Sequence, residues 1–168
     1  FGMIYFAEGA ILGYITALNS LYLLSFNISM TQIGLVSTIA MIPFVLKIFL
    51  GMLSDRFNLL GWGHRKPYII IGLLLQGACL LVVPLLNPGE QYGLFVMLAF
   101  LMVTGMALYD TCTDGLALDT TPPEEEGRIQ GVMVIGRALG VIAVGGMGFL
   151  AQQAAWGTVF IALAALTF

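Results

Sequence analysis

Six apolar stretches joined by short polar connections make up most of this sequence. They lie near residues 3–25, 32–53, 68–86, 92–117, 130–152 and 156–168. A helix that spans a bilayer needs about 20 apolar residues, so the first five stretches are long enough to cross and the last is incomplete. With 60% hydrophobic and only 9% charged residues, the chain cannot cover a surface that faces water. The pattern predicts an all-α membrane protein, a six-helix bundle with a truncated sixth span.

The positive charges indicate which connections lie in the cytoplasm. The loop between the second and third stretches carries Arg56, Arg65 and Lys66, and the loop between the fourth and fifth carries Arg128. The connection between the first and second stretches and the one between the third and fourth carry no Lys or Arg. Because cytoplasmic loops are enriched in Lys and Arg, we expect both basic loops, and with them the N-terminus, on the cytoplasmic side of an inner or plasma membrane.

Composition also argues against several other classes of protein. No basic patch exists outside the charged loop, so we expect no nucleic-acid partner. Cys79 and Cys112 both fall inside apolar stretches, and two distant cysteines make neither a disulfide framework nor a metal site. We expect no metal and no cofactor. Both ends of the sequence fall within apolar runs without features of a signal peptide, so we expect the chain to be part of a longer protein.

Ionisable residues inside the apolar stretches are the strongest functional signal, because charges in a bilayer core are expensive and are normally paired or functional. There are five of them: Glu8, Lys47, Asp110, Asp114 and Arg137. At a rise of about 1.5 Å per residue, four lie roughly 10–13 Å from the expected cytoplasmic ends of their helices, and Asp114 lies about 6 Å from its end. These helices arrive from alternating directions, yet their charges converge on one layer. The sequence therefore predicts a buried charge network in the cytoplasmic half of a bundle.

The expected pairing within this network follows from spacing. Asp110 and Asp114 are four residues apart and share a helix face. Arg137 on the following helix is their natural partner and Lys47 is the second. The network could be a structural clamp that holds three helices together, or a site for substrate or protons, and both interpretations stay open here.

Glu8 is the best candidate for proton coupling, because this pairing leaves it without a cation. A carboxyl in a poorly solvated site can load and release a proton near neutral pH. The alternative is that Glu8 is a solvated residue at the end of its helix.

Polar and aromatic side chains in the middle of the spans are candidates for the lining of a central cavity. They are Tyr14, Asn19, Gln76 and Tyr109. Such side chains more often pack or form interhelical hydrogen bonds than touch a ligand. Gly136 and Gly140, four residues apart in the fifth stretch, have the spacing that lets helix backbones approach closely. Plain packing is the favoured explanation, and a helix that rocks against its neighbour is the alternative.

The charged loop carries a recognisable order of residues: Gly51, Asp55 and Arg56, then Gly63, Arg65 and Lys66. This order resembles the signature loop between helices 2 and 3 of the major facilitator superfamily. The resemblance implies that Asp55 and the loop cations help to hold a cytoplasmic gate between the two halves of a transporter. One departure is that residues 57–62 form a longer insert between the two parts of the motif than the family usually has.

The stretch from Asp110 to Gly140 also resembles that superfamily. Together with the loop, it is similar to the branches of folate–biopterin, muropeptide and sugar permeases and to the related bacteriochlorophyll-delivery group. The superfamily has two halves of six helices each, so the chain would correspond to most of the N-terminal half. The resemblance implies that its partners are the lipid bilayer, the missing C-terminal half and a small-molecule substrate.

The expected function is secondary active transport of a small organic solute by alternating access, as a proton symporter, with substrate bound between the halves near the midplane. The alternative is a non-transporting membrane scaffold or a pigment-complex assembly factor with the same fold. An enzyme is not expected, because the single histidine, His64, lies in the charged loop and no catalytic set accompanies it. A channel is not expected either, because no loop resembles a selectivity filter.

Overall fold

The chain is helical along nearly all of its length in the computed structural model, which describes residues 1–61, 63–153 and 155–167, with side chains for all of these except 60 and 149–153. The first three expected stretches are built from several helical pieces each: α1 Gly2–Gly13, the π-helix η1 Tyr14–Leu18 and α2 Asn19–Leu24; α3 Met30–Val45 and α4 Lys47–Arg56; and α5 Lys66–Val82 with the 3-10 turn η3 Val83–Leu85. The last three are single helices: α6 Tyr92–Thr120, α7 Glu126–Gln153 and α8 Trp156–Thr167. A short 3-10 turn, η2 Leu59–Gly61, lies in the loop before α5. The all-α fold expected from the sequence is confirmed.

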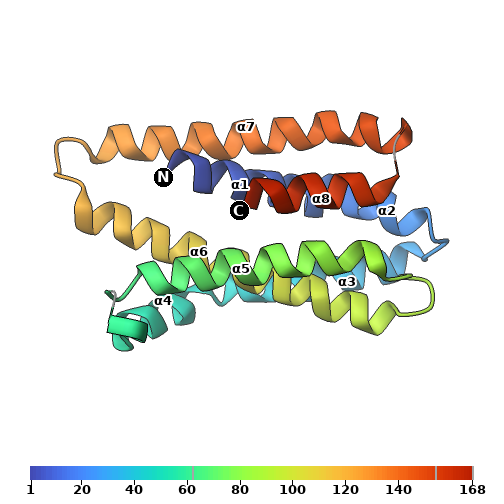
Figure 1. The fold of residues 1–168 in the computed structure, drawn as a ribbon, viewed down its shortest axis with the longest axis horizontal. Helices are drawn as coiled ribbons and strands as arrows, with labels where there is room; N and C mark the ends of the chain where they lie inside the picture. The colour runs from blue at the N-terminus through green and yellow to red at the C-terminus, as the bar shows by residue number, and fades with distance from the viewer. Residues whose placement is uncertain (62, 154, 168) are drawn as a thin grey trace.

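The helices run along the long axis of the molecule and form one bundle (Figure 1). The main contacts are of α1 with α7, of α5 with α6, of α3 and α4 with α6, and of α5 with α8. The loop residues 57–61, 63–65 and 121–125 lie at the same end of the bundle, at the left of Figure 1. We call this the charged end. The connections 25–29 and 86–91 lie at the opposite end.

Prolines account for the breaks in two of the segments. Pro43 lies inside α3, where it removes a backbone hydrogen bond, and the helix is interrupted at Leu46 before α4 begins. Pro84 lies in the 3-10 turn that ends the third segment. The ends of other segments differ slightly from expectation: α7 begins at Glu126 and not at 130, because acidic residues favour a helix N-terminus. Phe168, the end of the last expected stretch, lies outside the described residues.

Four helical segments within the described residues are long and apolar enough to cross a membrane: Met30–Arg56, Lys66–Leu85, Tyr92–Thr120 and Glu126–Gly148. Helix α6 is the most buried of them and forms the centre of the bundle, whereas α3, α4 and α7 leave many large apolar side chains exposed, among them Val45, Ile48, Val134 and Ile142. Such long apolar faces suit lipid or another apolar partner and not water.

Glycines let two pairs of helices approach to backbone contact. A Cβ atom on Gly72 would lie 2.6 Å from the carbonyl oxygen of Gly105, so α5 and α6 touch at this point. A Cβ on Gly9 would overlap the backbone of Arg137, and one on Gly140 would overlap the carbonyl oxygen of Phe6. The contact between α1 and α7 therefore depends on small residues from both helices, and it fixes how the two helices face each other.

Candidate functional site: two charge clusters

The contact between α1 and α7 brings Glu8 and Arg137 together. The guanidinium of Arg137 donates two hydrogen bonds to Oε2 of Glu8, from Nη2 at 2.8 Å and from Nε at 3.1 Å. Because Gly9 follows Glu8 and touches the backbone of Arg137, the close helix contact sets the geometry of this ion pair. Two hydrogen bonds between charged groups make it a strong and directional interaction.

Asp110 on α6 joins this pair to a second cation. Its Oδ1 accepts a hydrogen bond from Nη2 of Arg137 at 3.3 Å, and its Oδ2 lies 3.1 Å from Nζ of Lys47 on α4. Lys47 also lies over the ring of Phe44, 4.9 Å from its centroid. The result is a continuous chain of ion pairs, Glu8 to Arg137 to Asp110 to Lys47, that links α1, α7, α6 and α4.

Asp114 joins the group through a tyrosine. The hydroxyl of Tyr5 on α1 donates a hydrogen bond to Oδ1 of Asp114. The ring of Tyr5 also faces Arg137, whose Cζ lies 4.9 Å from the ring centroid. We call these six residues the central charge cluster: Tyr5, Glu8, Lys47, Asp110, Asp114 and Arg137.

The acids and cations of the central charge cluster differ in exposure. The side chains of Glu8 and Asp110 are 1% and 0% exposed, whereas those of Arg137 and Lys47 are 37% and 34% exposed. The carboxylates therefore lie in the interior of the bundle, and the cations reach over them from the flanking helices α7 and α4. Anything that approaches this face of α1 and α6 meets the cations first.

Two expectations about these pairs are corrected by the structure. Glu8 was expected to have no cation, or to be solvated at a helix end, but it is buried and paired with Arg137. Asp114 was expected to pair with Arg137 or Lys47, but it receives the Tyr5 hydroxyl. Sequence reasoning missed Tyr5, although it lies three residues before Glu8 and so on the same face of α1.

The four expected cavity-lining residues lie deep in the bundle. Tyr109 donates to Oε1 of Gln76 at 3.3 Å, and Gln76 donates to Oγ1 of Thr167 on α8 at 3.1 Å. Both are fully buried and act as interhelical hydrogen-bonding groups. Tyr14 donates to Oδ1 of Asn19 at 3.3 Å, and these two residues line a small pocket among apolar side chains.

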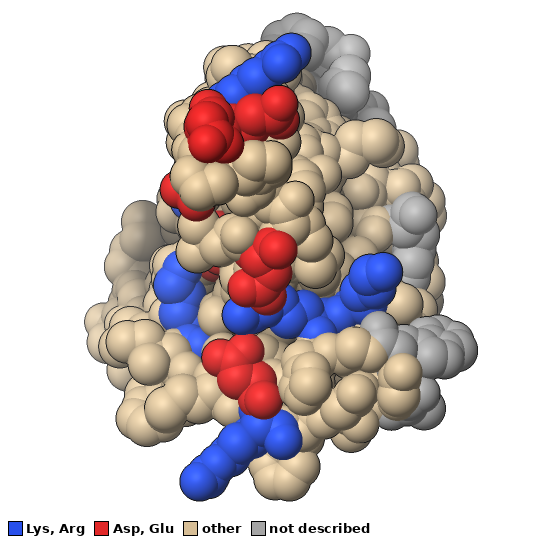
Figure 2. All heavy atoms as spheres, turned by 90° about the vertical axis from the view of Figure 1, so that its left-hand side faces the viewer, with Lys and Arg blue, Asp and Glu red and all other residues tan. Residues whose placement is uncertain are grey.

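The charged end holds a second group of ion pairs (Figure 2). Nε of Arg65 lies 2.6 Å from Oδ2 of Asp119 at the end of α6, and Nη2 of Arg65 lies 3.4 Å from Oδ1 of Asp55 at the end of α4. The guanidinium passes over Gly115, where a Cβ atom would overlap it. We call Asp55, Arg65 and Asp119 the charged-end cluster. Sequence reasoning had not assigned Asp119 to this site.

The other residues of the loop motif shape the chain around this cluster. A Cβ on Gly51 would lie 2.9 Å from Cγ2 of Thr111, so Gly51 lets α4 approach α6. Gly63 has a φ of 96°, which favours glycine. Within the described residues, neither Arg56 nor Lys66 forms an ion pair. Arg65 is therefore the motif cation that makes the contacts.

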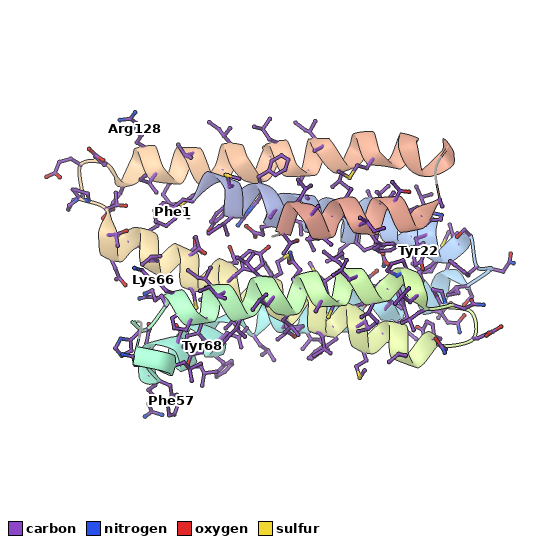
Figure 3. The ribbon with its side chains drawn as sticks, viewed as in Figure 1. Phe1, Tyr22, Phe57, Lys66, Tyr68 and Arg128 are labelled. Carbon is purple, nitrogen blue, oxygen red and sulfur yellow. The ribbon has the colours of Figure 1, made fainter. Side chains whose placement is uncertain are left out.

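Tyr68 ties the two sides of this loop together. Its hydroxyl donates to the carbonyl oxygen of Phe57 at 3.0 Å, just after α4 ends (Figure 3). Because α5 begins at Lys66, this bond connects the start of one helix to the end of the previous one. It fixes the loop on which Arg65 is carried. Among the residues that the structure describes, no group of His, Cys, Asp and Glu side chains has the arrangement of a metal site.

The sequence matches the family model of the Major Facilitator Superfamily over residues 1–168. The chain belongs to the Major Facilitator Superfamily. Its apolar spanning helices and this membership make it an integral membrane protein.

Curated relatives of this superfamily member are named as transporters. It is 28% identical to the anhydromuropeptide permease of Escherichia coli (strain K12) over 142 residues, which cover 83% of this chain and 29% of the permease. It is 28% identical to the folate-biopterin transporter of Synechocystis sp. over 145 residues, which cover 86% of this chain and 28% of that protein. It is 29% identical to the putative transporter AmpG 4 of Rickettsia felis over 136 residues, covering 75% of this chain and 32% of that protein. The chain thus spans less than a third of the length of these relatives.

Proposed function

We propose that this chain forms most of the N-terminal half of a secondary active transporter that moves a small organic solute by alternating access, driven by protons. Membership of the superfamily and the names of the relatives, a muropeptide permease and a folate-biopterin transporter, support this proposal. The aligned residues cover 29% of the permease, and the rest of such a protein would supply the second half. The substrate would bind between the halves near the bilayer midplane.

The central charge cluster is the observation that carries the proposal. A chain of ion pairs connects four helices in the interior of a membrane bundle, where a charge without a partner is costly. A proton that neutralised one carboxylate would leave its cation without that partner. The helices that carry the two residues would then favour a different arrangement. Such a cluster couples protonation to helix movement.

Glu8 is the proposed proton site. Its Oε2 accepts both hydrogen bonds from Arg137, while its Oε1 is buried and has no hydrogen-bond partner within the described residues. A buried oxygen without a partner is costly for a carboxylate, and a proton there would remove the charge. Asp110 also binds Arg137, so the guanidinium keeps one carboxylate when Glu8 is neutral.

The charged end is the proposed cytoplasmic end, and its motif the gate. Its Lys and Arg residues follow the distribution expected of cytoplasmic loops, which supports the proposal of a cytoplasmic N-terminus in an inner or plasma membrane protein. In the proposed gate, Gly51 and Gly63 shape the chain, and Arg65 holds Asp55 and Asp119 together. Arg56 and Lys66 remain available for contacts with the second half.

The proposal is tested by uptake into liposomes that contain the full-length parent protein, with and without an imposed proton gradient. The panel of solutes should include muropeptides, pterins, sugars and porphyrin-like pigments. Accumulation that depends on the gradient would support proton-coupled transport. No transport of any of them, with a stably co-purifying membrane complex or pigment, would favour the scaffold or assembly function.

The role of Glu8 is tested by Glu8→Gln in the same liposomes. Because the amide cannot carry the proton, uptake driven by the gradient should be lost while exchange of substrate across the membrane continues. Glu90→Gln, which changes an exposed acid in the turn before α6, is the matched control and should leave uptake unchanged. Gradient-driven uptake by Glu8→Gln equal to that of the unaltered protein would reject this role.

A further inference from the structure

Tyr5 on α1 contacts two charged residues of the central charge cluster, Asp114 and Arg137. Its hydroxyl donates to Asp114, and its ring faces the guanidinium of Arg137 at 4.9 Å. Tyr5 itself is 4% exposed, whereas its two partners are partly exposed. One tyrosine therefore separates a cation from a carboxylate that has no cation of its own within the described residues.

Asp114 is a natural competitor for Arg137. It lies one helical turn from Asp110 on the same face of α6, and Asp110 already binds this guanidinium at 3.3 Å. Arg137 and Asp114 both contact the side chain of Tyr5, Arg137 through the ring and Asp114 through the hydroxyl. A partly buried carboxylate that lost its hydrogen bond would gain from pairing with a nearby cation.

We propose that Tyr5 is a positioning residue that keeps Asp114 from competing for Arg137, so that the guanidinium stays on Glu8 and Asp110. The hydroxyl occupies Asp114, and the ring supports the planar guanidinium through a cation–π contact. The inference rests on the proposed role of Glu8 as the proton site. It adds that Asp114 is a reserve partner for Arg137, one turn nearer the charged end.

The charged groups around Arg137 define what Tyr5 controls. From α1 it faces Glu8 and the ring of Tyr5, from α6 it faces Asp110, and beyond Asp110 lies Lys47 of α4. Counting Asp114, which contacts Tyr5, the central charge cluster holds three carboxylates and two cations. Because acids outnumber cations, the carboxylates compete for Arg137. The outcome of this competition sets the fraction of time for which Arg137 pairs with Glu8.

The test removes the hydroxyl alone by Tyr5→Phe in the full-length parent protein. Proton-driven uptake should fall by about tenfold, the loss expected for a hydrogen bond to a charged group. Its pH dependence should move toward higher pH, because Glu8 without a steady guanidinium is neutralised more readily. Adding Asp114→Asn, which removes the competing charge, should restore both rate and pH dependence. A purely structural role for Tyr5 predicts no such rescue.

Tyr22→Phe is the matched control, since Tyr22 is another buried tyrosine of the first segment and lies at the end of the bundle away from Arg128 (Figure 3). It should leave uptake and its pH dependence unchanged. Uptake by Tyr5→Phe equal to that of the unaltered protein, or no recovery in Tyr5→Phe with Asp114→Asn, would overturn the proposal.

A second measurement keeps this test independent of transport. The coupling between Glu8 and Arg137 can be measured from the stabilities of Glu8→Gln, Arg137→Gln and the double variant in detergent. The coupling should fall in the Tyr5→Phe background and return when Asp114→Asn is added. An unchanged coupling would overturn the Tyr5 proposal even if the parent protein proved to transport protons, and a changed one would support it even if no uptake were found.

Discussion

The two charge clusters of this bundle have the same plan but opposite surroundings. In each, one arginine lies between two carboxylates: Arg137 between Glu8 and Asp110 at 2.8 and 3.3 Å, and Arg65 between Asp119 and Asp55 at 2.6 and 3.4 Å. The carboxylates around Arg137 are 1% and 0% exposed, and those around Arg65 are 57% and 58% exposed. Nearly equal distances therefore describe interactions of very different consequence.

Exposure decides what happens when a partner is lost. A buried carboxylate without its cation keeps an uncompensated charge in a poorly solvated site, whereas an exposed one is solvated by water. The central charge cluster can therefore change state only when its charges are rebalanced, for example by a proton. The charged-end cluster can open and close at small cost, as a gate requires.

The largest effect is expected for Arg137→Met, which removes the cation shared by Glu8 and Asp110. Because buried Glu8 loses the cation that pairs with it and Asp110 is left with Lys47 alone, the free energy of unfolding should fall by about 3–5 kcal/mol. The measurement is denaturation of the protein in mixed micelles. Adding Glu8→Gln should recover part of the loss, because the uncompensated charge on Glu8 disappears while Asp110 still pairs with Lys47. A loss below about 1 kcal/mol, typical of surface pairs, would remove the difference between the clusters.

An intermediate effect is expected for Gly9→Ala, which acts on the central charge cluster through the backbone. The new Cβ would overlap the backbone of Arg137, so α1 and α7 must move apart and the Glu8–Arg137 pair must lengthen. Overpacking of this kind costs about 1–3 kcal/mol. The control is Gly131→Ala on α7, where a Cβ meets nothing within 4 Å. This substitution should change the stability of the protein by less than about 0.5 kcal/mol. Equal effects of the two substitutions in the same denaturation assay would contradict the close contact.

The sequence was sufficient for the all-α fold and for the common level of three of the charges, because apolar length and helical rise set both. The depths of Lys47, Asp110 and Arg137 placed them in one layer, and the structure brings them together. Pairing was harder to predict, since it depends on how helices rotate about their axes. Glu8 meets Arg137 because Gly9 and Gly140 bring α1 and α7 into backbone contact, which hydropathy does not encode.

The contacts that sequence reasoning missed have a common cause. Tyr5 and Asp119 each act as the partner of a residue far away in the chain, Asp114 and Arg65. A tyrosine in an apolar helix is usually a packing residue, and an aspartate near a helix end is usually solvated, so neither residue type signals the partner by itself. The longer loop at 57–62 made the position of Arg65 harder to predict, and Tyr68 fixes it.

The smallest effect is expected at the charged end. Arg65→Gln should lower the stability of the protein by less than about 1 kcal/mol, and the difference should shrink further at high salt, because Asp55 and Asp119 are exposed. Gly115→Ala should match it, since the new Cβ displaces only the flexible guanidinium, and should add nothing in the Arg65→Gln background. A loss close to that of Arg137→Met in the full-length protein would show that its remaining helices cover Asp55 and Asp119. The proposed gate would then close by burying its charges. The difference in exposure between the two clusters would then apply only to this half and not to the full-length protein.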